Sequence, residues 1–135
     1  MTRLRVLVVD DQPDAAYIVC VLLEVLGHTC VTAMTGQEAL AVANDFEPDV
    51  AIVDIGLPDL SGYEIARALR AQPRFSKVFL AALTGWGTAL DQACALDAGF
   101  DCHVTKPADR MKLQEILEQA ATRVGARDPI LPTQA

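Results

Sequence analysis

Five short apolar runs alternate along this chain with five stretches that have the composition of helices. Such alternation is typical of repeated βα units, in which parallel strands form one sheet and helices cover both of its faces. The runs are Leu4–Val9, His28–Ala33, Val50–Val53, Val78–Leu83 and Cys102–Thr105. The sequence therefore predicts an α/β fold of three layers, a doubly wound (βα)5 parallel sheet.

The polar content of the runs predicts the order of the strands. Strands buried on both faces are continuously aliphatic, whereas edge strands tolerate polar residues. Three runs are nearly all aliphatic, and the other two contain polar residues: His28, Thr29 and Thr32 in the second, His103 and Thr105 in the fifth. We therefore expect the second and fifth strands at the edges, which is compatible with the flavodoxin-like order 2-1-3-4-5.

Residues that start and end helices stand between the runs. Two pairs have the spacing of capping boxes, Thr35 with Glu38 and Ser61 with Glu64. Glycines stand where C-terminal caps are expected: Gly27, Gly99 and Gly125. Because 135 residues suit one domain and the helical pattern is lost after Gly125, we predict one domain over residues 1–125 and a C-terminal tail or linker over residues 126–135.

The charge of the chain excludes one class of partner. Eleven basic and eighteen acidic residues give a formal net charge of −7, which would repel a phosphate backbone, so no direct binding to nucleic acid is expected. The longest apolar runs fall far short of the roughly 20 residues that a membrane-spanning helix needs. We therefore expect a cytoplasmic protein without membrane contact.

The four cysteines, Cys20, Cys30, Cys94 and Cys102, show neither CxxC spacing nor histidines at the intervals of a zinc site. Disulfides and metal sites at these residues are therefore not expected. The prediction is buried, reduced thiols in a cytosolic protein.

Four of the runs are followed by polar side chains: Asp10 and Asp11 after the first, Asp54 after the third, Thr84 after the fourth and Lys106 after the fifth. The carboxyl ends of parallel strands meet at one edge of a sheet, and ligands of open α/β sheets bind beyond that edge. Each side chain has an ordinary alternative role as a helix cap or loop residue. Their convergence at one edge favours a binding site.

The chemistry of this set favours a phosphoryl group. Three carboxylates at neighbouring strand ends repel one another, so one must be protonated or a cation must join them. Oxygen ligands without His or Cys select Mg²⁺. Lys106 and Thr84 add a positive charge and a hydroxyl, which suit a phosphate. Asp54, alone at the end of the central strand, is the best-placed nucleophile.

These residues resemble the response-regulator receiver family of two-component signalling over about residues 5–124. The likeness rests on four blocks: Val8-Val9-Asp10-Asp11, Val53-Asp54-Ile55-Gly56-Leu57-Pro58 followed by Gly62, Leu83-Thr84-Gly85, and Lys106-Pro107. It implies a domain that takes a phosphoryl group from a phosphohistidine donor, either a sensor histidine kinase or a histidine phosphotransfer domain. Phosphorylation would then change how the domain binds a downstream protein.

The resemblance also implies a role for each residue of the site. Asp54 would be the phosphoacceptor. Mg²⁺ would be held by Asp10, Asp11, Asp54 and the carbonyl of Gly56, while Thr84 and Lys106 would contact the phosphate and the Lys106–Pro107 bond would be cis. Such a domain catalyses its own phosphorylation and dephosphorylation, and no turnover of an outside small molecule is expected.

One position departs from the family pattern. Many receivers carry Tyr or Phe three residues before the lysine, where this chain has His103. His103 either rotates inward when Thr84 moves toward the phosphate, as part of the switch, or is an edge-strand histidine that solvent satisfies. Trp86, two residues past Thr84, is expected to sense whether the site is occupied.

Two other functions stay open. A degenerate receiver that acts only as a docking module would normally have lost an acidic or lysine position, and none is lost here. An aspartyl-phosphate hydrolase is a weaker alternative, because it needs a second Asp two residues after the nucleophile, where this chain has Gly56. Residues 83–87 and 99–103 are similar to those of receivers attached to hybrid histidine kinases.

Overall fold

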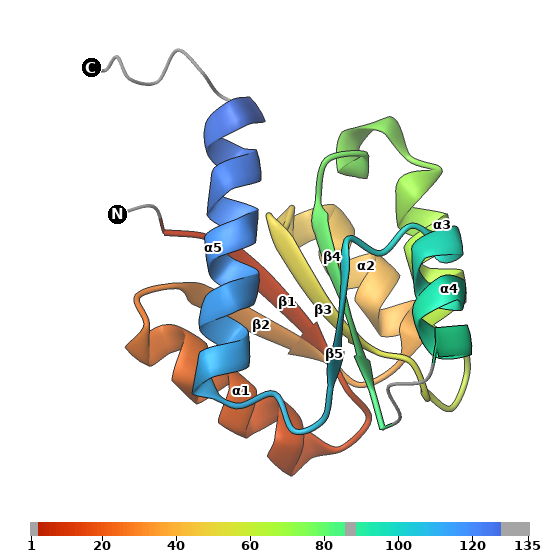
Figure 1. The fold of residues 1–135 in the computed structure, drawn as a ribbon, viewed down its shortest axis with the longest axis horizontal. Helices are drawn as coiled ribbons and strands as arrows, with labels where there is room; N and C mark the ends of the chain where they lie inside the picture. Colours follow the sequence, from red (N-terminus) through yellow and green to blue (C-terminus); the bar gives the residue numbers. More distant parts are fainter. Residues whose placement is uncertain (1–2, 86–88, 128–135) are drawn as a thin grey trace.

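The computed structural model describes residues 3–85 and 89–127 (Figure 1). One sheet has the order β2-β1-β3-β4-β5, and every neighbouring pair is parallel. Its strands are β1 Arg5–Val9, β2 Thr29–Ala33, β3 Val50–Asp54, β4 Phe79–Thr84 and β5 Cys102–Thr105. The doubly wound fold and the flavodoxin-like order 2-1-3-4-5 are confirmed, and each strand begins and ends within one residue of its prediction.

Helices cover both faces of this sheet (Figure 1). They are α1 Pro13–Val25, α2 Gly36–Phe46, α3 Gly62–Arg70, α4 Ala89–Ala98 and α5 Arg110–Arg127, with a short 3-10 helix η1 at Pro73–Phe75. Successive side chains of a strand point to opposite faces, so each face has its own apolar core. The core against α1 and α5 includes Val6, Val8, Leu23, Ile52 and Leu113. The core against α2, α3 and α4 includes Leu7, Val9, Ala39, Val53 and Ile65.

The central and edge strands of the sheet differ in burial, as their composition predicts. All residues of β3 and β4 are buried, whereas β2 and β5 are largely half-buried. The polar residues of β2 and β5 therefore lie where water or a helix can satisfy them. Among the described helices, none is long and apolar enough to cross a membrane.

The helix ends follow the predicted signals in part. Ser61 and Glu64 form a reciprocal capping box at α3. At α2 the hydroxyl of Thr35 accepts from the amide of Glu38, but the carboxylate of Glu38 accepts from Met34 instead, so the predicted box is only half formed.

Glycines at two predicted helix ends have the left-handed backbone that a C-terminal cap requires, with φ of 97° at Gly27 and 111° at Gly99. The prediction of a helix end at Gly125 is wrong, because α5 continues to Arg127. A single glycine is tolerated inside a helix when the flanking residues favour it. The predicted tail begins within this last turn, and residues 128–135 lie outside the described part of the chain.

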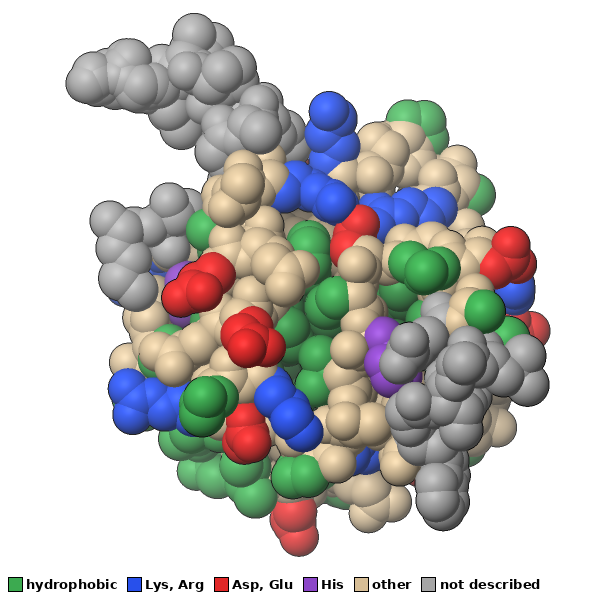
Figure 2. Space-filling model, in the orientation of Figure 1, with side chains coloured by type: hydrophobic (Ala, Val, Ile, Leu, Met, Phe, Trp, Pro, Cys, Tyr) green, Lys and Arg blue, Asp and Glu red, His purple; other side chains and the backbone are tan. Residues whose placement is uncertain are grey.

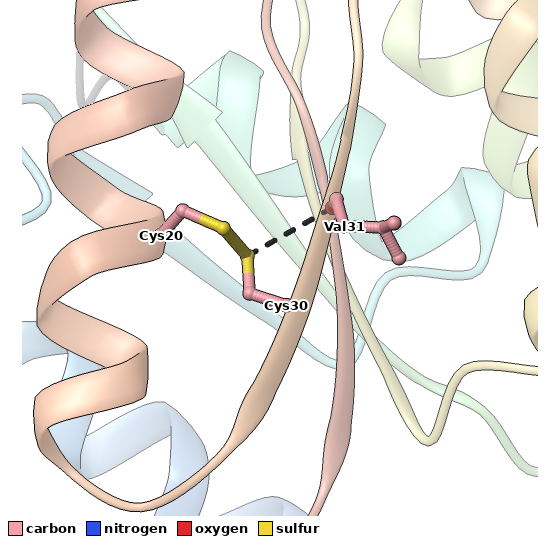
Figure 3. Close-up of a disulfide and its surroundings, with 3 residues drawn as sticks. All are labelled: Cys20, Cys30 and Val31. Atoms are coloured by element: carbon pink, nitrogen blue, oxygen red, sulfur yellow. Dashed lines mark hydrogen bonds between the residues drawn. A yellow bond between two sulfur atoms is a disulfide. The ribbon is translucent and has the colours of Figure 1, made fainter.

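The prediction for the cysteines is wrong for one pair, since Cys20 of α1 and Cys30 of β2 form a disulfide (Figure 3). The turn at Gly27 folds β2 back along α1 and brings their Cα atoms to 5.6 Å, inside the range that a disulfide spans. A separation of ten residues along the chain does not by itself predict a disulfide, because the pairing depends on the path of that turn. Cys94 and Cys102 are free and half-buried.

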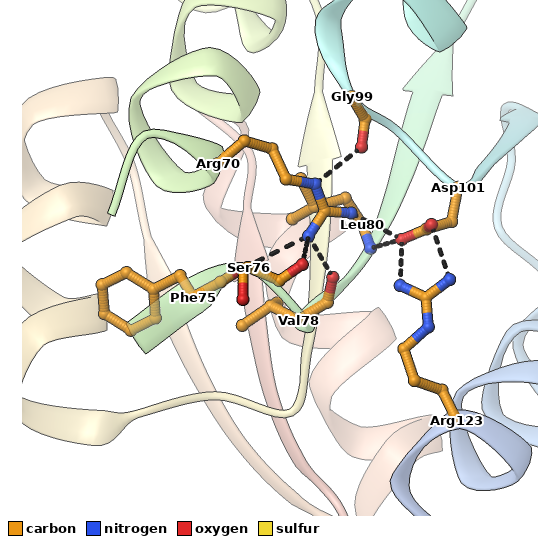
Figure 4. A network of polar contacts seen from close by, with 8 residues as sticks. All are labelled: Arg70, Phe75, Ser76, Val78, Leu80, Gly99, Asp101 and Arg123. Atoms are coloured by element: carbon orange, nitrogen blue, oxygen red, sulfur yellow. Dashed lines mark hydrogen bonds and ion pairs between the residues drawn. The ribbon is translucent and has the colours of Figure 1, made fainter. Parts of the chain in front are cut away.

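A network of charges joins α3, β4 and α5 at the amino end of β5 (Figure 4). The carboxylate of Asp101 accepts from Arg70 Nη2 at 2.8 Å and from the amide of Leu80 at 2.8 Å. Arg123 donates two further bonds, at 2.9 and 2.8 Å. Figure 2 shows basic and acidic side chains side by side toward the top of the molecule.

Replacing Asp101 by Asn will lower the free energy of unfolding by about 2 kcal/mol, because an amide cannot accept all four bonds and leaves two half-buried guanidinium groups without their anion. Urea unfolding measures the change. Asp45→Asn, at an exposed position of α2, is the matched control and should shift stability by less than about 0.5 kcal/mol. Equal stability of the two variants would contradict the prediction.

Candidate functional site

The carboxyl end of β3 places Asp54 in a buried position. Its side chain follows four buried aliphatic residues, and only 4% of the residue is exposed. The loop after it is held close by Gly62, whose amide donates to the carbonyl of Ile55 at 3.0 Å. A Cβ at Gly62 would lie 2.9 Å from the carbonyl oxygen of Asp54, so a larger residue there would displace the end of β3.

Three carboxylates converge at this edge of the sheet. Oxygen atoms of Asp10, Asp11 and Asp54 lie within 4.8 Å of one another. Asp10 is 3% exposed and accepts from the amide of Gln12 at 2.9 Å, and Asp54 accepts from the amide of Gly56 at 3.0 Å. The strand-end argument from the sequence therefore brings together the residues that it named.

The electrostatics of this cluster favour a cation. Burial raises the pKa of Asp10, and the charge of Asp54 adds to the rise, although the amide of Gln12 opposes it. Two buried carboxylates and a half-exposed one thus hold more negative charge than their surroundings compensate. The donors are all carboxylate oxygens, which suit a hard divalent ion such as Mg²⁺.

Lys106 supplies the nearest positive charge from the end of β5. Its Nζ lies 2.8 Å from Asp54 Oδ2. Burial alone would lower the pKa of Lys106, but the hydrogen bond to Asp54 and the charges of Asp54, Asp10 and Asp11 raise it, so the ammonium stays protonated. The Lys106–Pro107 bond is cis, as the resemblance implies.

Thr84 and His103 are joined directly. Thr84 ends β4 and is buried, and its Oγ1 lies 3.1 Å from Nε2 of His103 on the neighbouring strand β5. His103 therefore has a hydrogen-bond partner in Thr84, and its part in a switch stays a prediction. Trp86 lies outside the described residues.

Two residues that support the site were missed by sequence reasoning. Lys112 of α5 donates from Nζ to the carbonyls of Thr105 and Pro107, at 2.8 and 3.1 Å, and so fixes the loop that carries Lys106. Asp59 accepts from two amides at the start of α2 and ties the loop after β3 to that helix. The contacts of Asp59 join residues far apart in the sequence, and those of Lys112 depend on the path of the loop after β5. No local sequence pattern predicts either.

A groove of about 330 Å³ opens beside the acidic cluster, between α1 and the loop after β5. Asp10 and Lys106 line one end of it, while Ala15, Ile18 and Pro107 line its apolar part. Ile18 is 57% exposed and Tyr17, on the same helix, is 69% exposed. An apolar surface therefore leads directly to the charged pocket.

Replacing Asp10 by Asn in protein kept free of divalent cations will raise the free energy of unfolding near neutral pH by roughly 1 kcal/mol, because a buried carboxylate that repels Asp54 is removed. The folded pKa of Asp10 lies above 3.8, so the folded protein binds this proton more tightly than the unfolded chain. Wild-type stability therefore falls as pH rises from about 4 through the folded pKa.

Urea unfolding in a chelator at about pH 4 and about pH 7 measures this difference. The gain from Asp10→Asn should be larger at the higher pH, whereas Asp45→Asn, at an exposed position, should change stability by less than about 0.5 kcal/mol in both measurements. A gain that is larger at the lower pH would contradict the sign.

Comparison with known proteins agrees with this geometry. Residues 6–118 match the response regulator receiver domain family. The chain is 42% identical over 102 residues to the transcriptional regulatory protein KdpE of Mycobacterium tuberculosis, covering 76% of this chain and 44% of that protein. It is 32% identical over 134 residues to the phosphate regulon regulator PhoB of Pseudomonas aeruginosa, covering 99% of this chain and 58% of PhoB. The chain thus spans about half the length of these two relatives.

The fold has a close counterpart among solved structures. The chemotaxis response regulator CheY4 of Vibrio cholerae superposes with a TM-score of 0.83 at 28% identity, covering 88% of this chain and 99% of that one. The resemblance stated from four sequence blocks is therefore shown by a family match over most of the chain and by a shared fold. This chain belongs to the response regulator receiver domain family.

Proposed function

We propose that this chain receives a phosphoryl group on Asp54 from a phosphohistidine donor and passes the signal on by changing its surface. The observation that carries the proposal is the buried carboxylate of Asp54, which meets the ammonium of Lys106 at 2.8 Å inside a cluster of three carboxylates. Family membership supports the assignment of Asp54 as the acceptor.

The residues of the pocket divide the work of phosphoryl transfer. Mg²⁺, held by Asp10, Asp11, Asp54 and the carbonyl of Gly56, would supply positive charge to the phosphate oxygens. An oxygen of Asp54 attacks the phosphorus, the P–N bond of the phosphohistidine breaks, and the imidazole keeps the electron pair. Lys106 then pairs with a phosphate oxygen, and Thr84 donates its hydroxyl to another.

The pocket also favours a phosphorylated state that lasts. Hydrolysis of an acyl phosphate is helped by a general base that activates water. Position 56, two residues past Asp54, is glycine and offers no such base. This arrangement suits a signal better than rapid turnover.

The groove along α1 is the proposed docking site for the donor. Its apolar part suits a helical surface of a histidine kinase or phosphotransfer domain, and its charged end would receive the phosphohistidine. The exposed apolar residues Tyr17, Ile18 and Val21 extend this surface along α1. Three expectations stay predictions: the absence of nucleic-acid binding, a cytoplasmic location and an origin in a hybrid kinase.

The Thr84–His103 bond is the proposed start of the surface change. A hydroxyl has one hydrogen, so a Thr84 that donates to His103 must release it in order to donate to phosphate. His103 lies on β5 beside a small apolar hollow lined by Ala95, Leu96 and Phe100. Release of His103 would therefore alter the face formed by α4 and β5.

Incubation with Mg²⁺ and acetyl phosphate should add one phosphoryl group to the wild type and none to Asp54→Asn, because the acceptor oxygen is lost. Intact mass measures the adduct, and a chelator should prevent it. Asp45→Asn should be labelled like the wild type. An unlabelled wild type would favour the docking-only alternative, and equal labelling of Asp54→Asn would reject the assigned acceptor.

Replacing His103 by Phe should tighten binding of beryllofluoride, a phosphate mimic, by roughly 2–10-fold in the presence of Mg²⁺. The reason is that the hydrogen bond between Thr84 and His103 then no longer competes with the bond from Thr84 to the mimic. Titration followed by NMR measures the affinity. In a Thr84→Ala background the same change at His103 should have no effect. Weaker or unchanged binding by His103→Phe would exclude this coupling.

A further inference from the structure

The disulfide between α1 and β2 plays no part in phosphoryl transfer. Cys30 lies opposite Val6 in the register of β2 with β1, four residues before Asp10, which is roughly 13 Å along the strand. Cys20 lies between the buried face of α1, marked by Val19 and Leu23, and its exposed face. The pair therefore lies away from the acidic cluster, on the flank of α1 that faces the sheet edge.

We propose that Cys20 and Cys30 form a reversible thiol–disulfide modification site, oxidised by peroxide and reduced by a dithiol protein of the thioredoxin class. Both residues are half-buried, so small oxidants and a reductant can reach them. Their Cα separation of 5.6 Å suits the bond. In the disulfide-bonded structure Cys30 Sγ lies 3.8 Å from the carbonyl oxygen of Val31, so a thiol formed there by reduction has an acceptor nearby (Figure 3).

Oxidation of the two thiols by one peroxide is a two-electron reaction. One thiolate attacks a peroxide oxygen, the O–O bond breaks, and a sulfenic acid and water form. The second thiol attacks that sulfur, so the S–S bond forms and a second water leaves. The reductant reverses this by attacking one sulfur with a thiolate and ends as a disulfide itself.

The free thiol of Cys102 is a poor site for oxidation. Burial, with the charge of Asp101, raises the pKa of Cys102 to about 11, so it holds almost no thiolate near neutral pH. Cys94 is free as well. Disulfides in cytosolic proteins are most often catalytic or redox-sensing. Because a cytoplasmic location is predicted for this chain, the property to test is whether the disulfide forms reversibly.

The bond controls how firmly α1 is held on the sheet. β2 is an edge strand, and the disulfide ties it to the second half of α1 across the turn at Gly27. Without the bond, this part of α1 is held by the packing of Val19 and Leu23 and by the backbone bonds of the turn. Reduction should therefore loosen the end of α1 and leave the acidic cluster unchanged.

The test measures thiols and stability in the full chain. After peroxide, alkylation in denaturant followed by intact mass should find two of the four cysteines labelled, and after thioredoxin it should find all four. The reduced protein should melt roughly 5–15 °C lower, and its α1 amides beyond Cys20 should exchange hydrogen faster. Acetyl phosphate labelling of Asp54 should be equal in both states.

Matched variants assign the response. Cys30→Ser should remove the shift in melting temperature, whereas the double variant Cys94→Ser, Cys102→Ser should keep all of it. Four labelled thiols after peroxide would overturn the proposal. So would a disulfide that thioredoxin cannot reduce in the folded protein, since the bond would then be structural. Because the thiol count and the melting temperature do not depend on phosphorylation, a failure of Asp54 labelling in both redox states would reject the proposed function and leave this result intact.

Discussion

Negative charge buried at the end of an aliphatic sheet is the constraint on which this molecule depends. Asp10 and Asp54 follow strands whose residues are almost fully buried, so water cannot screen them from each other. The ammonium of Lys106, which follows β5, offsets part of that negative charge. The charge that remains favours the binding of a cation, alone or together with a phosphate group. A bound cation would relieve this imbalance, which supports the role proposed for the cluster.

The fold was predictable because its signals are local or depend on general rules of α/β sheets. Polar residues at His28 and His103 marked the edge strands, and aliphatic runs marked the centre. The site followed from one further rule, that carboxyl ends of parallel strands meet at one edge. Asp10, Asp54 and Lys106 come from three strands, yet that rule brought them together without any knowledge of the helices.

Other features could not be predicted, for physical reasons. The Cys20–Cys30 bond depends on the angle between α1 and β2. Gly27 permits the turn between them, but the presence of a glycine at that position does not specify the angle. The contacts of Lys112 were not predicted, because helical periodicity describes a helix surface and says nothing of a neighbouring loop whose carbonyls need donors. The second half of the Thr35 capping box failed because Glu38 had a competing amide within reach.

Among the described residues, several side-chain bonds lie at the amino ends of the strands, opposite the site. Asp101, just before β5, binds two arginines, and Asp49, just before β3, accepts from the amide of Arg5 at 2.9 Å. At the carboxyl ends, the side-chain bonds of Thr84 and Lys106 are ones that a phosphate could replace. Elements that move in signalling are drawn from the less stable part of a structure. Anchoring of the sheet at one end would thus let the proposed site exchange partners at the other end without loss of the fold.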